Sequence, residues 1–289
     1  MVNGYAPTNL AEALRLRSEE TLTPYAGGTD LMIKEDRTDA FLFLHKIPEL
    51  KAVSEDAENV YIGAACSYTS LLENGLIPEA LKDAMSRIAA PAIRNEGTVG
   101  GNIANASPKA DSALILFAAD ALVKLQSARA ERVIPIKDFY VGRGKTVLES
   151  DELLTQIVLP KRWLGGYYYK KIGARKALAI SRLSFCGLLG MEGVDGKDGT
   201  DGDRIAHVAC AFGAVSDVII RHADIDRMFV GKTREEARSL RADYLKAYDE
   251  AIVPIQGRVS ADYRKRVCLN LLEDFLDQRV FRDNCTACI

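Results

Sequence analysis

Residues 94–111 read RNEGTVGGNIANASPKAD, a stretch with few groups that could perform acid–base or nucleophilic chemistry. It contains the pair Gly100 and Gly101, small residues, amide side chains and a carboxylate at Asp111, nine positions after Asn102. Glycine lets the backbone approach another group closely, and successive backbone N–H groups can form a concave site for an anion. The stretch therefore predicts a bound cofactor that carries phosphate.

A second glycine-rich stretch, PYAGGTDL at residues 24–31, overlaps the end of a predicted strand at 23–26. Like TVGGN at 98–102, it offers consecutive backbone donors beside side chains that form hydrogen bonds, such as Thr29. Two such turns, about 70 residues apart, could hold one pyrophosphate from both sides. On the pattern alone, two ordinary turns are an equally good interpretation.

The composition is that of a globular protein, and it excludes several classes of partner. The 289 residues are 48% hydrophobic and 27% charged, and their net charge of −2 offers no basic field for nucleic acid. No apolar run has the length of a membrane span, and the start MVNGYAPTNL lacks the features of a secretory signal. We therefore expect a cytoplasmic protein with no membrane span.

The six cysteines do not have the pattern of a metal or cluster site. Cys285 and Cys288 form a C-x-x-C motif, but no second pair accompanies it, so we interpret the motif as part of a frayed tail. No set of cysteines has the spacing of iron–sulfur ligands. The other four lie in apolar surroundings and are expected to be buried free thiols: Cys66, Cys186, Cys210 and Cys268.

Hydrophobic periodicity predicts an α+β fold without regular β-α-β alternation. We divide the chain into three regions, at residues 1–54, 55–165 and 166–289. The third region begins with a strand-like YYYKKIG and has two longer strand-like runs, at 179–193 and 204–220, before predicted helices at 233–252 and 260–280. An antiparallel sheet backed by helices is therefore expected there.

Shorter elements are expected in the first two regions. Thr8 is predicted to cap a helix near 9–17. The remaining expected elements are strands at 40–45, 60–66, 123–128, 132–136 and 153–159 and helices at 67–74, 79–88 and 112–119. In the third region, the acidic segment VDGKDGTDGD at 194–203 lacks the register of a calcium loop and is interpreted as a hairpin turn.

Several chemical motifs fail on inspection. GRGKT at 142–146 ends like a phosphate-binding loop, but the position of that motif's first glycine is Phe139. No G-x-G-x-x-G opens a helix, and the three histidines are scattered. The sequence therefore predicts no catalytic side chain and no metal ligand, and it favours a cofactor that carries its own chemistry.

Four motifs in order resemble one family. PYAGGTDLMI, IRNEGTVGGNIANASPKAD, DFYVGRGKTVLESDELLTQIVLP and YYYKKIGARKALAIS, which span residues 24–181, are similar to segments of the FAD-binding medium subunit of the molybdenum hydroxylases. This family includes xanthine dehydrogenase, nicotinate dehydrogenase and carbon monoxide dehydrogenase. The resemblance implies a two-lobed FAD-binding domain of the vanillyl-alcohol-oxidase/PCMH type at 1–165, followed by the antiparallel sheet with helices.

The resemblance also implies the positions that bind FAD. Tyr25–Leu31 and Thr98–Asn102 correspond to two loops around the pyrophosphate. Asp111 corresponds to a carboxylate at the sugar or adenosine part, Leu154 to a backbone contact with the flavin, and Lys170 to a lysine near the isoalloxazine carbonyl edge. The full set is Tyr25, Ala26, Gly27, Gly28, Thr29, Asp30, Leu31, Thr98, Val99, Gly100, Gly101, Asn102, Asp111, Leu154 and Lys170.

The function that the resemblance implies is electron transfer. A flavoprotein oxidoreductase subunit of this kind receives electrons from an iron–sulfur subunit, which receives them from a molybdenum-cofactor subunit, and passes them to NAD or another acceptor. We expect a dimer of such heterotrimers, and the segment KALAIS favours a purine- or nicotinate-like N-heterocycle as the substrate. Two alternatives stay open: a stand-alone FAD-dependent oxidoreductase of the same wider fold, and a scaffold without a cofactor.

Overall fold

The computed structural model of the chain describes residues 4–33, 40–193, 202–257 and 259–282. The chain forms two compact units. Unit 1 comprises Met1–Ile77, Met85–Ser107 and Asp120–Pro160, and unit 2 comprises Pro78–Ala84, Pro108–Ala119 and Lys161–Ile289. Two short segments from the first half of the chain therefore belong to the same unit as the C-terminal half. The expected division of residues 1–165 into two lobes at residue 54 stays a prediction.

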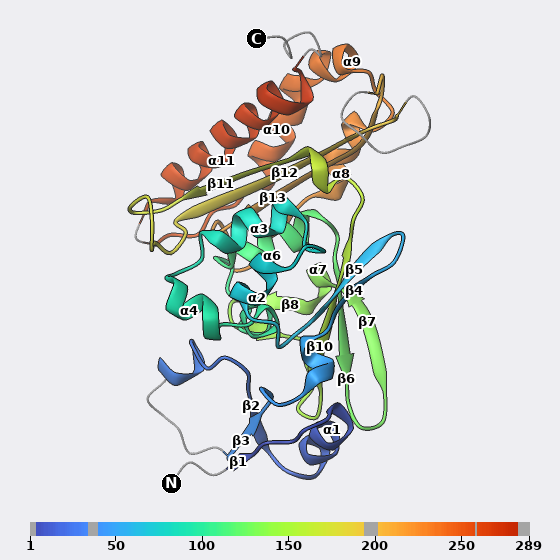
Figure 1. Cartoon of the computed structure of the whole chain (residues 1–289). Helices are drawn as coiled ribbons and strands as arrows, with labels where there is room; N and C mark the ends of the chain where they lie inside the picture. Colours follow the sequence, from blue (N-terminus) through green and yellow to red (C-terminus); the bar gives the residue numbers. More distant parts are fainter. Residues whose placement is uncertain (1–3, 34–39, 194–201, 258, 283–289) are drawn as a thin grey trace. The chain divides into compact units, whose positions relative to one another are not determined.

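Unit 1 begins with a small parallel sheet of strand order β1-β3-β2 (Figure 1). Its strands are β1 at Gly4–Tyr5, β2 at Leu22–Tyr25 and β3 at Ala40–Phe43. Helix α1, at Leu10–Glu19, buries its apolar face in the same cluster as residues of β2 and β3. The expected cap at Thr8 is wrong: Asn9 caps the helix, because its side-chain oxygen accepts the backbone N–H of Glu12 at 2.9 Å.

The second sheet of unit 1 is antiparallel, with strand order β4-β5-β10-β6-β7. Its strands are β4 at Val53–Glu55, β5 at Asn59–Gly63, β6 at Leu122–Gln126, β7 at Glu131–Pro135 and β10 at Leu153–Pro160. The central strand, β10, alternates buried and partly buried residues after a fully buried start, as expected for a strand between two neighbours. A bulge between Leu154 and Gln156 interrupts its pairing with β6.

The remaining elements of unit 1 are short. They are α2 at Tyr68–Glu73, α4 at Pro91–Glu96, α5 at Val99–Ala104, α7 at Ile136–Phe139, β8 at Tyr140–Gly142, β9 at Lys145–Thr146 and single 3-10 turns at Leu31–Ile33 and Pro48–Lys51. The interpretation of residues 98–102 as a turn is wrong, because they open helix α5. Six-residue helices with two glycines carry too little periodicity to be recognised from sequence.

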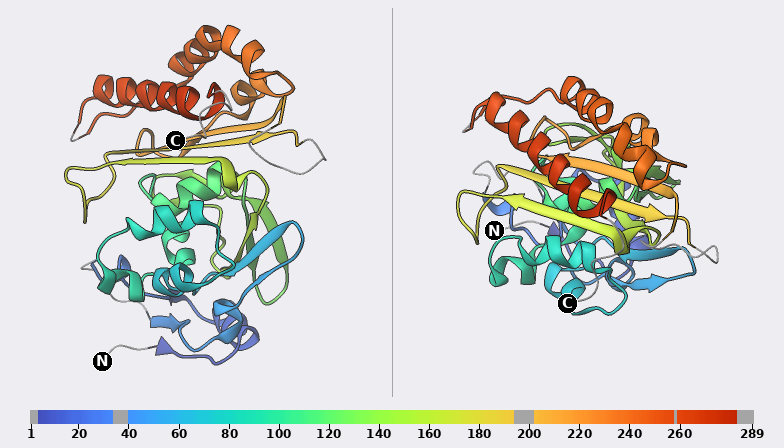
Figure 2. Two further views of the ribbon diagram at one scale, coloured as in Figure 1. Left: turned by 45° about the horizontal axis from the view of Figure 1, so that its top comes forward. Right: turned by 90° about the horizontal axis from the view of Figure 1, so that it is seen from above.

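Unit 2 is built on an antiparallel sheet of order β11-β12-β13-β14. Its strands are β11 at Tyr167–Ile172, β12 at Leu183–Met191, β13 at Ile205–Gly213 and β14 at Ile220–Arg221. Its helices are α3 at Glu79–Ser86, α6 at Asp111–Ala118, α8 at Ala223–Asp226, α9 at Arg234–Ser239, α10 at Arg241–Ala251 and α11 at Ala261–Phe275. The last residues of α3 fall in unit 1. Unit 2 also contains 3-10 turns at Leu164–Gly166 and Arg227–Phe229 and a π-helical turn at Leu276–Val280. In Figure 2, α10 and α11 lie along one face of this sheet.

The two faces of the unit 2 sheet are covered by elements from different parts of the chain. Phe185 of β12 packs with Phe275 of α11 on one face. On the other face, a Cβ added to Gly213 would lie 3.5 Å from Leu114 of α6. Every residue of α6 is buried, which explains its uniformly apolar sequence.

A buried polar network lies in the core of unit 2. The carboxylate of Asp226, 2% exposed, accepts hydrogen bonds from the hydroxyls of Tyr244 at 2.8 Å and Tyr248 at 2.6 Å. It also accepts the backbone N–H of Cys210 and pairs with Arg221. The network satisfies a charged group inside an apolar cluster, so we interpret it as structural.

The observed elements confirm some of the expectations from sequence and correct others. The predicted helix at 233–252 is broken at Leu240 into α9 and α10, and the two long strand-like runs contain the shorter strands β12 and β13. The four cysteines expected to be buried free thiols are so. The C-x-x-C motif and most of the 194–203 segment lie outside the described residues. No helix in the described part of the chain is long and apolar enough to cross a membrane.

Candidate functional site

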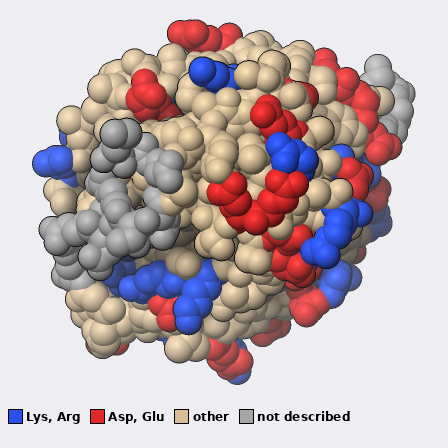
Figure 3. Space-filling view, turned by 90° about the horizontal axis from the view of Figure 1, so that it is seen from below, with Lys and Arg blue, Asp and Glu red and all other residues tan. Residues whose placement is uncertain are grey.

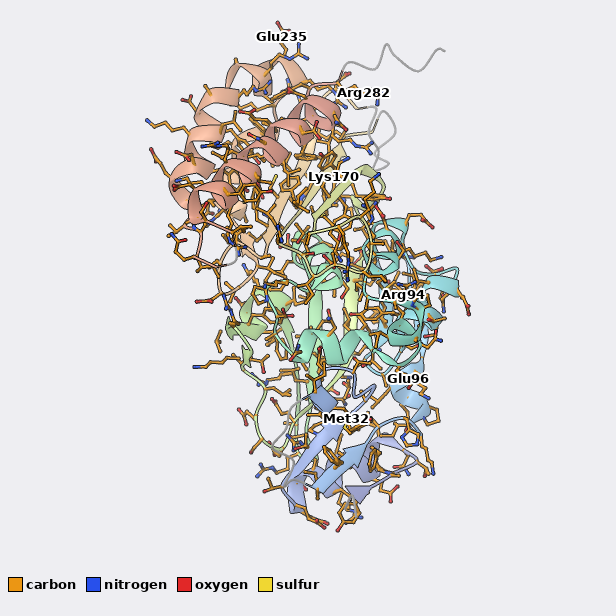
Figure 4. The ribbon with its side chains drawn as sticks, turned by 90° about the vertical axis from the view of Figure 1, so that its left-hand side faces the viewer. Met32, Arg94, Glu96, Lys170, Glu235 and Arg282 are labelled. Carbon is orange, nitrogen blue, oxygen red and sulfur yellow. The ribbon has the colours of Figure 1, made fainter. Side chains whose placement is uncertain are left out.

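The two glycine-rich stretches come together in unit 1. A Cβ built on Gly27 would lie 1.9 Å from the carbonyl oxygen of Glu96, so only glycine permits this close packing of the two backbones. The side-chain amide of Asn105, which follows α5, donates to the Asp30 carboxylate at 3.1 Å. Figure 4 labels Met32, which directly follows the first stretch, and Glu96, which lies two residues before Thr98 of the second. The structure thus places side by side two segments that the sequence separates by about 70 residues.

The first stretch, Tyr25–Leu31, leaves backbone donors available. Gly28 has a φ of +70°, a conformation that favours glycine, and its position next to the Tyr25 ring leaves no room for a Cβ. The N–H groups of Gly27, Gly28 and Thr29 donate to no acceptor in the described part of the chain. All three residues are only partly buried. Consecutive donors of this kind can hold an anion.

The second stretch, Thr98–Asn102, differs from the expectation of free backbone donors. Thr98 caps α5 by accepting the Gly101 N–H at 3.1 Å on its hydroxyl and the Asn102 N–H at 3.0 Å on its carbonyl. The N–H groups of Val99 and Gly100 donate to Cys66 and Ala64 carbonyls at 3.1 and 2.9 Å. This part of the expectation is wrong, because helix capping and packing already use these groups.

The two glycines of the second stretch have different surroundings. A Cβ on Gly100 would lie 2.5 Å from the Cβ of Ala64, so this residue is required for packing within the protein. Gly101 is exposed, and its Cβ would meet only the Thr98 hydroxyl, at 2.8 Å. Packing within the described residues thus gives one reason for glycine at position 101, because a Cβ would displace the hydroxyl that caps α5, and it gives no second one. Close approach of a ligand to the backbone would supply one.

Asp111, the first residue of α6, is the centre of a buried cluster in unit 2. Its side chain is 6% exposed. One oxygen accepts hydrogen bonds from the hydroxyls of Ser181 at 2.7 Å and Tyr169 at 3.1 Å, and the other pairs with the Lys171 ammonium at 2.7 Å. Asp111 was expected as a site residue, but no pattern in the sequence indicated these three partners. The cluster holds β11 and the loop before β12 against the start of α6.

Lys170, the expected flavin lysine, does not join this cluster. Residues 169 and 171 lie on one face of β11, and residues 168 and 170 lie on the other. Lys170 is exposed, and its ammonium lies 5.3 Å from the centre of the Tyr168 ring (Figure 4). Alternation along YYYKKIG could have separated the two lysines by face, but it could not show which face meets Asp111.

The last expected position, Leu154, is 7% exposed and lies at the bulge of β10 in unit 1. A bulge can leave backbone groups outside the regular ladder. An ion pair fixes the start of this strand: Arg132 of β7 donates two hydrogen bonds, each 2.7 Å long, to Glu152. These bonds hold the pKa of the Glu152 carboxyl below its ordinary value.

The glycine stretches present no reactive nucleophile. Burial raises the pKa of the nearby Cys66 thiol to about 11, so it is protonated at neutral pH. The described residues contain no group of three or more side chains suited to a metal ion. Acidic and basic side chains occur together on the face shown in Figure 3. The site is therefore suited to hold an anionic cofactor rather than to perform chemistry itself.

Comparison with known families agrees with this geometry. Residues 1–162 match the family described as the FAD-binding domain in molybdopterin dehydrogenases, and the chain belongs to this family. Residues 167–279 match the C-terminal domain of the carbon monoxide dehydrogenase flavoprotein. The chain is thus an FAD-binding flavoprotein of the molybdenum hydroxylase family, as the four motifs indicated, and FAD is its cofactor.

Individual relatives are similar over part of the chain. The nicotinate dehydrogenase FAD subunit of Eubacterium barkeri is 33% identical over 192 residues, which cover 61% of this chain and 64% of that protein. The xanthine dehydrogenase FAD-binding subunit of Escherichia coli O157:H7 is 36% identical over 60% of this chain and 63% of that protein. The glyceraldehyde dehydrogenase medium chain of Sulfolobus acidocaldarius is 29% identical over 90% of this chain and 91% of that protein. The matches to the first two relatives thus span less than two thirds of those proteins.

Solved structures show the same fold. Carbon monoxide dehydrogenase from Oligotropha carboxidovorans superposes with a TM-score of 0.85 at 23% identity, covering 98% of this chain and 99% of that one. Quinoline 2-oxidoreductase from Pseudomonas putida 86 gives a TM-score of 0.82 at 20% identity and 97% coverage of both chains. The expected α+β fold, with a C-terminal antiparallel sheet and helices, is confirmed.

Proposed function

We propose that this chain is the FAD-carrying electron-transfer subunit of a molybdenum hydroxylase complex. In this role it takes electrons from iron–sulfur clusters and passes them to NAD or another acceptor while the complex hydroxylates a purine- or nicotinate-like N-heterocycle. The observation that carries the proposal is the junction of the two glycine stretches, where free N–H groups at 27–29 lie beside the segment that contains Gly101. The names of the nicotinate and xanthine dehydrogenase relatives support the choice of substrate class.

The residues present fit FAD. The free N–H groups within Tyr25–Leu31 would hold the pyrophosphate. Thr98–Asn102 would shape the second side, where the exposed Gly101 lets a ligand approach the backbone closely. Asp111 as a contact of the sugar or adenosine part, and Leu154 and Lys170 as contacts of the flavin, stay proposals that the family resemblance supports. When bound, FAD supplies the redox chemistry, because it can exchange electrons singly or in pairs.

The side chains of this chain would position and tune rather than react. Gly27 sets the spacing of the two stretches, because a Cβ there would displace the Glu96 carbonyl. Gly100 holds the second stretch against Ala64, which a Cβ would also displace. Thr98 fixes the start of α5, so that Gly101 keeps its exposed position. A cation at Lys170 near a flavin would favour its reduced, anionic form. None of these roles needs a general acid or base.

The proposal includes partners and a location. An iron–sulfur subunit and a molybdenum-cofactor subunit would complete a heterotrimer, and two heterotrimers would form the complex in the cytoplasm. Two relatives are named as medium chains, of glyceraldehyde and carbon monoxide dehydrogenases, which supports a multi-subunit assembly.

The test is purification of the tagged chain from its native host. We expect two partner proteins, one with iron–sulfur absorbance and one with molybdenum, together with non-covalent FAD that acid precipitation releases into the supernatant. The complex, but not the isolated chain, should be reduced by a purine or by nicotinate. Recovery of the chain alone with full activity on a small substrate would instead support a stand-alone flavin enzyme.

A further inference from the structure

Arg264, near the start of α11, is a buried cation that is 5% exposed. Taking a guanidinium group out of water is costly unless hydrogen bonds replace those that water supplied. One of its terminal nitrogens donates to two backbone carbonyls, that of Arg182 at 2.7 Å and that of Ala214. Arg264 therefore joins two segments that are distant from each other in the chain.

The two carbonyls lie at one end of the unit 2 sheet. Arg182 directly precedes β12 and Ala214 directly follows β13, and these antiparallel strands pair Ser184 with Gly213. Helix α11 packs on one face of the sheet (Figure 2), and α6 packs on the other. The side chain of Arg264 thus meets the sheet at an end where elements from both faces can be connected.

Both segments lead to Asp111, the first residue of α6. Ser181, which precedes the first of the two carbonyls, donates its hydroxyl to the Asp111 carboxylate at 2.7 Å. The N–H of Ala214 donates to the carbonyl of Pro108 at 2.6 Å, and Pro108 lies three residues before Asp111. Arg264 is therefore connected to Asp111 by two routes, one through a hydrogen-bond partner of its side chain and one through its backbone.

The conformation of Ala214 shows that the second route has to be held in place. Its φ is +63°, a left-handed conformation that a residue with a side chain adopts only at a cost in free energy. Hydrogen bonds at both its carbonyl and its N–H offset that cost. Without Arg264, the carbonyl of Ala214, a residue that is 1% exposed, would lose this partner. We expect the backbone at Pro108 to shift with it.

We propose that Arg264 is a positioning residue for the FAD site, because it holds Asp111 where that carboxylate contacts the sugar or adenosine part of the cofactor. This inference rests on the proposed function, which assigns that contact to Asp111. Arg264 acts through Ser181 and Pro108 rather than by binding the cofactor itself.

The experiment is a double-mutant cycle on the full-length chain. Arg264→Gln, Asp111→Asn and the double variant are stripped of flavin, and the Kd for FAD is measured by the quenching of flavin fluorescence. Far-UV circular dichroism and urea unfolding show whether each variant folds. The visible circular dichroism of the bound FAD reports the surroundings of the flavin.

Arg221→Gln is the matched control. Arg221 is also a buried arginine of unit 2, with a side chain that is 5% exposed, but it pairs with Asp226 in the structural network of the core. Its removal should lower the urea midpoint, because it leaves a buried carboxylate without its cation. It should leave the Kd for FAD and the spectrum of the bound FAD close to those of wild type.

We expect Arg264→Gln to raise the Kd for FAD about tenfold in a folded chain, and Asp111→Asn to raise it at least as much. The double variant should bind FAD within about threefold of Asp111→Asn, because Arg264 acts through Asp111. The visible circular dichroism of FAD bound to Arg264→Gln should resemble that of Asp111→Asn rather than that of wild type. If Arg264→Gln does not fold, Arg264→Lys takes its place in the cycle, and this variant should retain part of the affinity because lysine keeps the charge on a shorter side chain.

The cycle separates failure of the inference from failure of the proposed function. If Asp111→Asn weakens FAD binding and the folded Arg264 variants do not, the inference is wrong while the proposed function stands. Additive losses in the double variant, or an equal loss in Arg221→Gln, would also overturn the inference, because Arg264 would then act independently of Asp111. If Asp111→Asn leaves FAD binding unchanged, the proposed role of Asp111 fails first and the inference fails with it.

Discussion

At the scale of single residues, the glycines of the two stretches have separable tasks. Gly27 and Gly100 are required by packing, since a Cβ would overlap the Glu96 carbonyl or Ala64. Gly101 has an open direction, limited only by the Thr98 hydroxyl. The sequence could not distinguish these glycines. It shows that each lacks a side chain, but not which atoms lie where the Cβ would be.

We predict that Gly101→Val lowers FAD occupancy severely and leaves the far-UV circular dichroism near that of wild type. The branched side chain would occupy the open direction at Gly101, where a ligand could approach the backbone. Gly75→Val is the matched control, because a Cβ at Gly75 meets nothing within 4 Å. Gly27→Ala should instead destabilise the fold. Unchanged flavin content in Gly101→Val would show that residues 98–102 have only a structural role.

We also predict that Lys171→Met destabilises the protein by about 3 kcal/mol, because it leaves the buried Asp111 carboxylate without its cation. Lys170→Met is the control and should change the free energy of unfolding by less than about 0.5 kcal/mol, because Lys170 is exposed. Urea unfolding at neutral pH measures both. Equal effects of the two substitutions would contradict the assignment of opposite faces.

At the scale of elements, sequence patterns located most strands and the longer helices. They failed where elements are short or polar, as at α4 and α5, because a helix of about one and a half turns shows no clear periodicity. They also joined α9 to α10 across Leu240, because both helices are built from good helix-forming residues.

The start of β10 gives a prediction about pH. The folded protein lowers the pKa of Glu152 below its ordinary value of 4.5, chiefly through the hydrogen bonds from Arg132. The stabilisation is therefore present above about pH 4.5 and is lost as the pH falls through the lower folded-state value. Arg132→Gln should lower the urea midpoint at pH 7, and the difference from wild type should shrink below pH 4.5.

Arg129→Gln is the control for this measurement. Arg129 pairs with Asp151 beside the same strand, but its side chain is 82% exposed, so its removal should have little effect at any pH. A difference between Arg132→Gln and wild type that does not depend on pH would show that Arg132 stabilises the sheet by packing alone.

At the scale of the whole molecule, the order of the chain and the two units do not coincide. Pro108–Ala119, which contains α6, comes from the first half of the sequence but packs in unit 2. The first family match, at 1–162, therefore includes a fully buried helix whose packing partners, β12 and β13, lie beyond it.

We predict that residues 1–162 expressed alone will be insoluble or will aggregate, because α6 would expose its apolar surface. The full chain should be soluble under the same conditions. Replacing Leu114 and Leu116 of α6, both fully buried, with Ser should restore some solubility to the fragment. A soluble, monomeric fragment with bound FAD would show that α6 can pack without the C-terminal sheet.

The sequence by itself determined the family, the cofactor and the α+β class, because these depend on local preferences: glycine at special backbone positions, alternation in strands and the order of motifs. Only the tertiary structure decided which donors stay free and which lysine meets Asp111. Lys171 and Asp111 are 60 residues apart, and their pairing depends on which face of β11 packs against α6. Thr98 likewise accepts the N–H groups of Gly101 and Asn102, which were expected from the sequence to be free donors. Such outcomes follow from the packing of segments distant in the chain, for which no local pattern carries a signal.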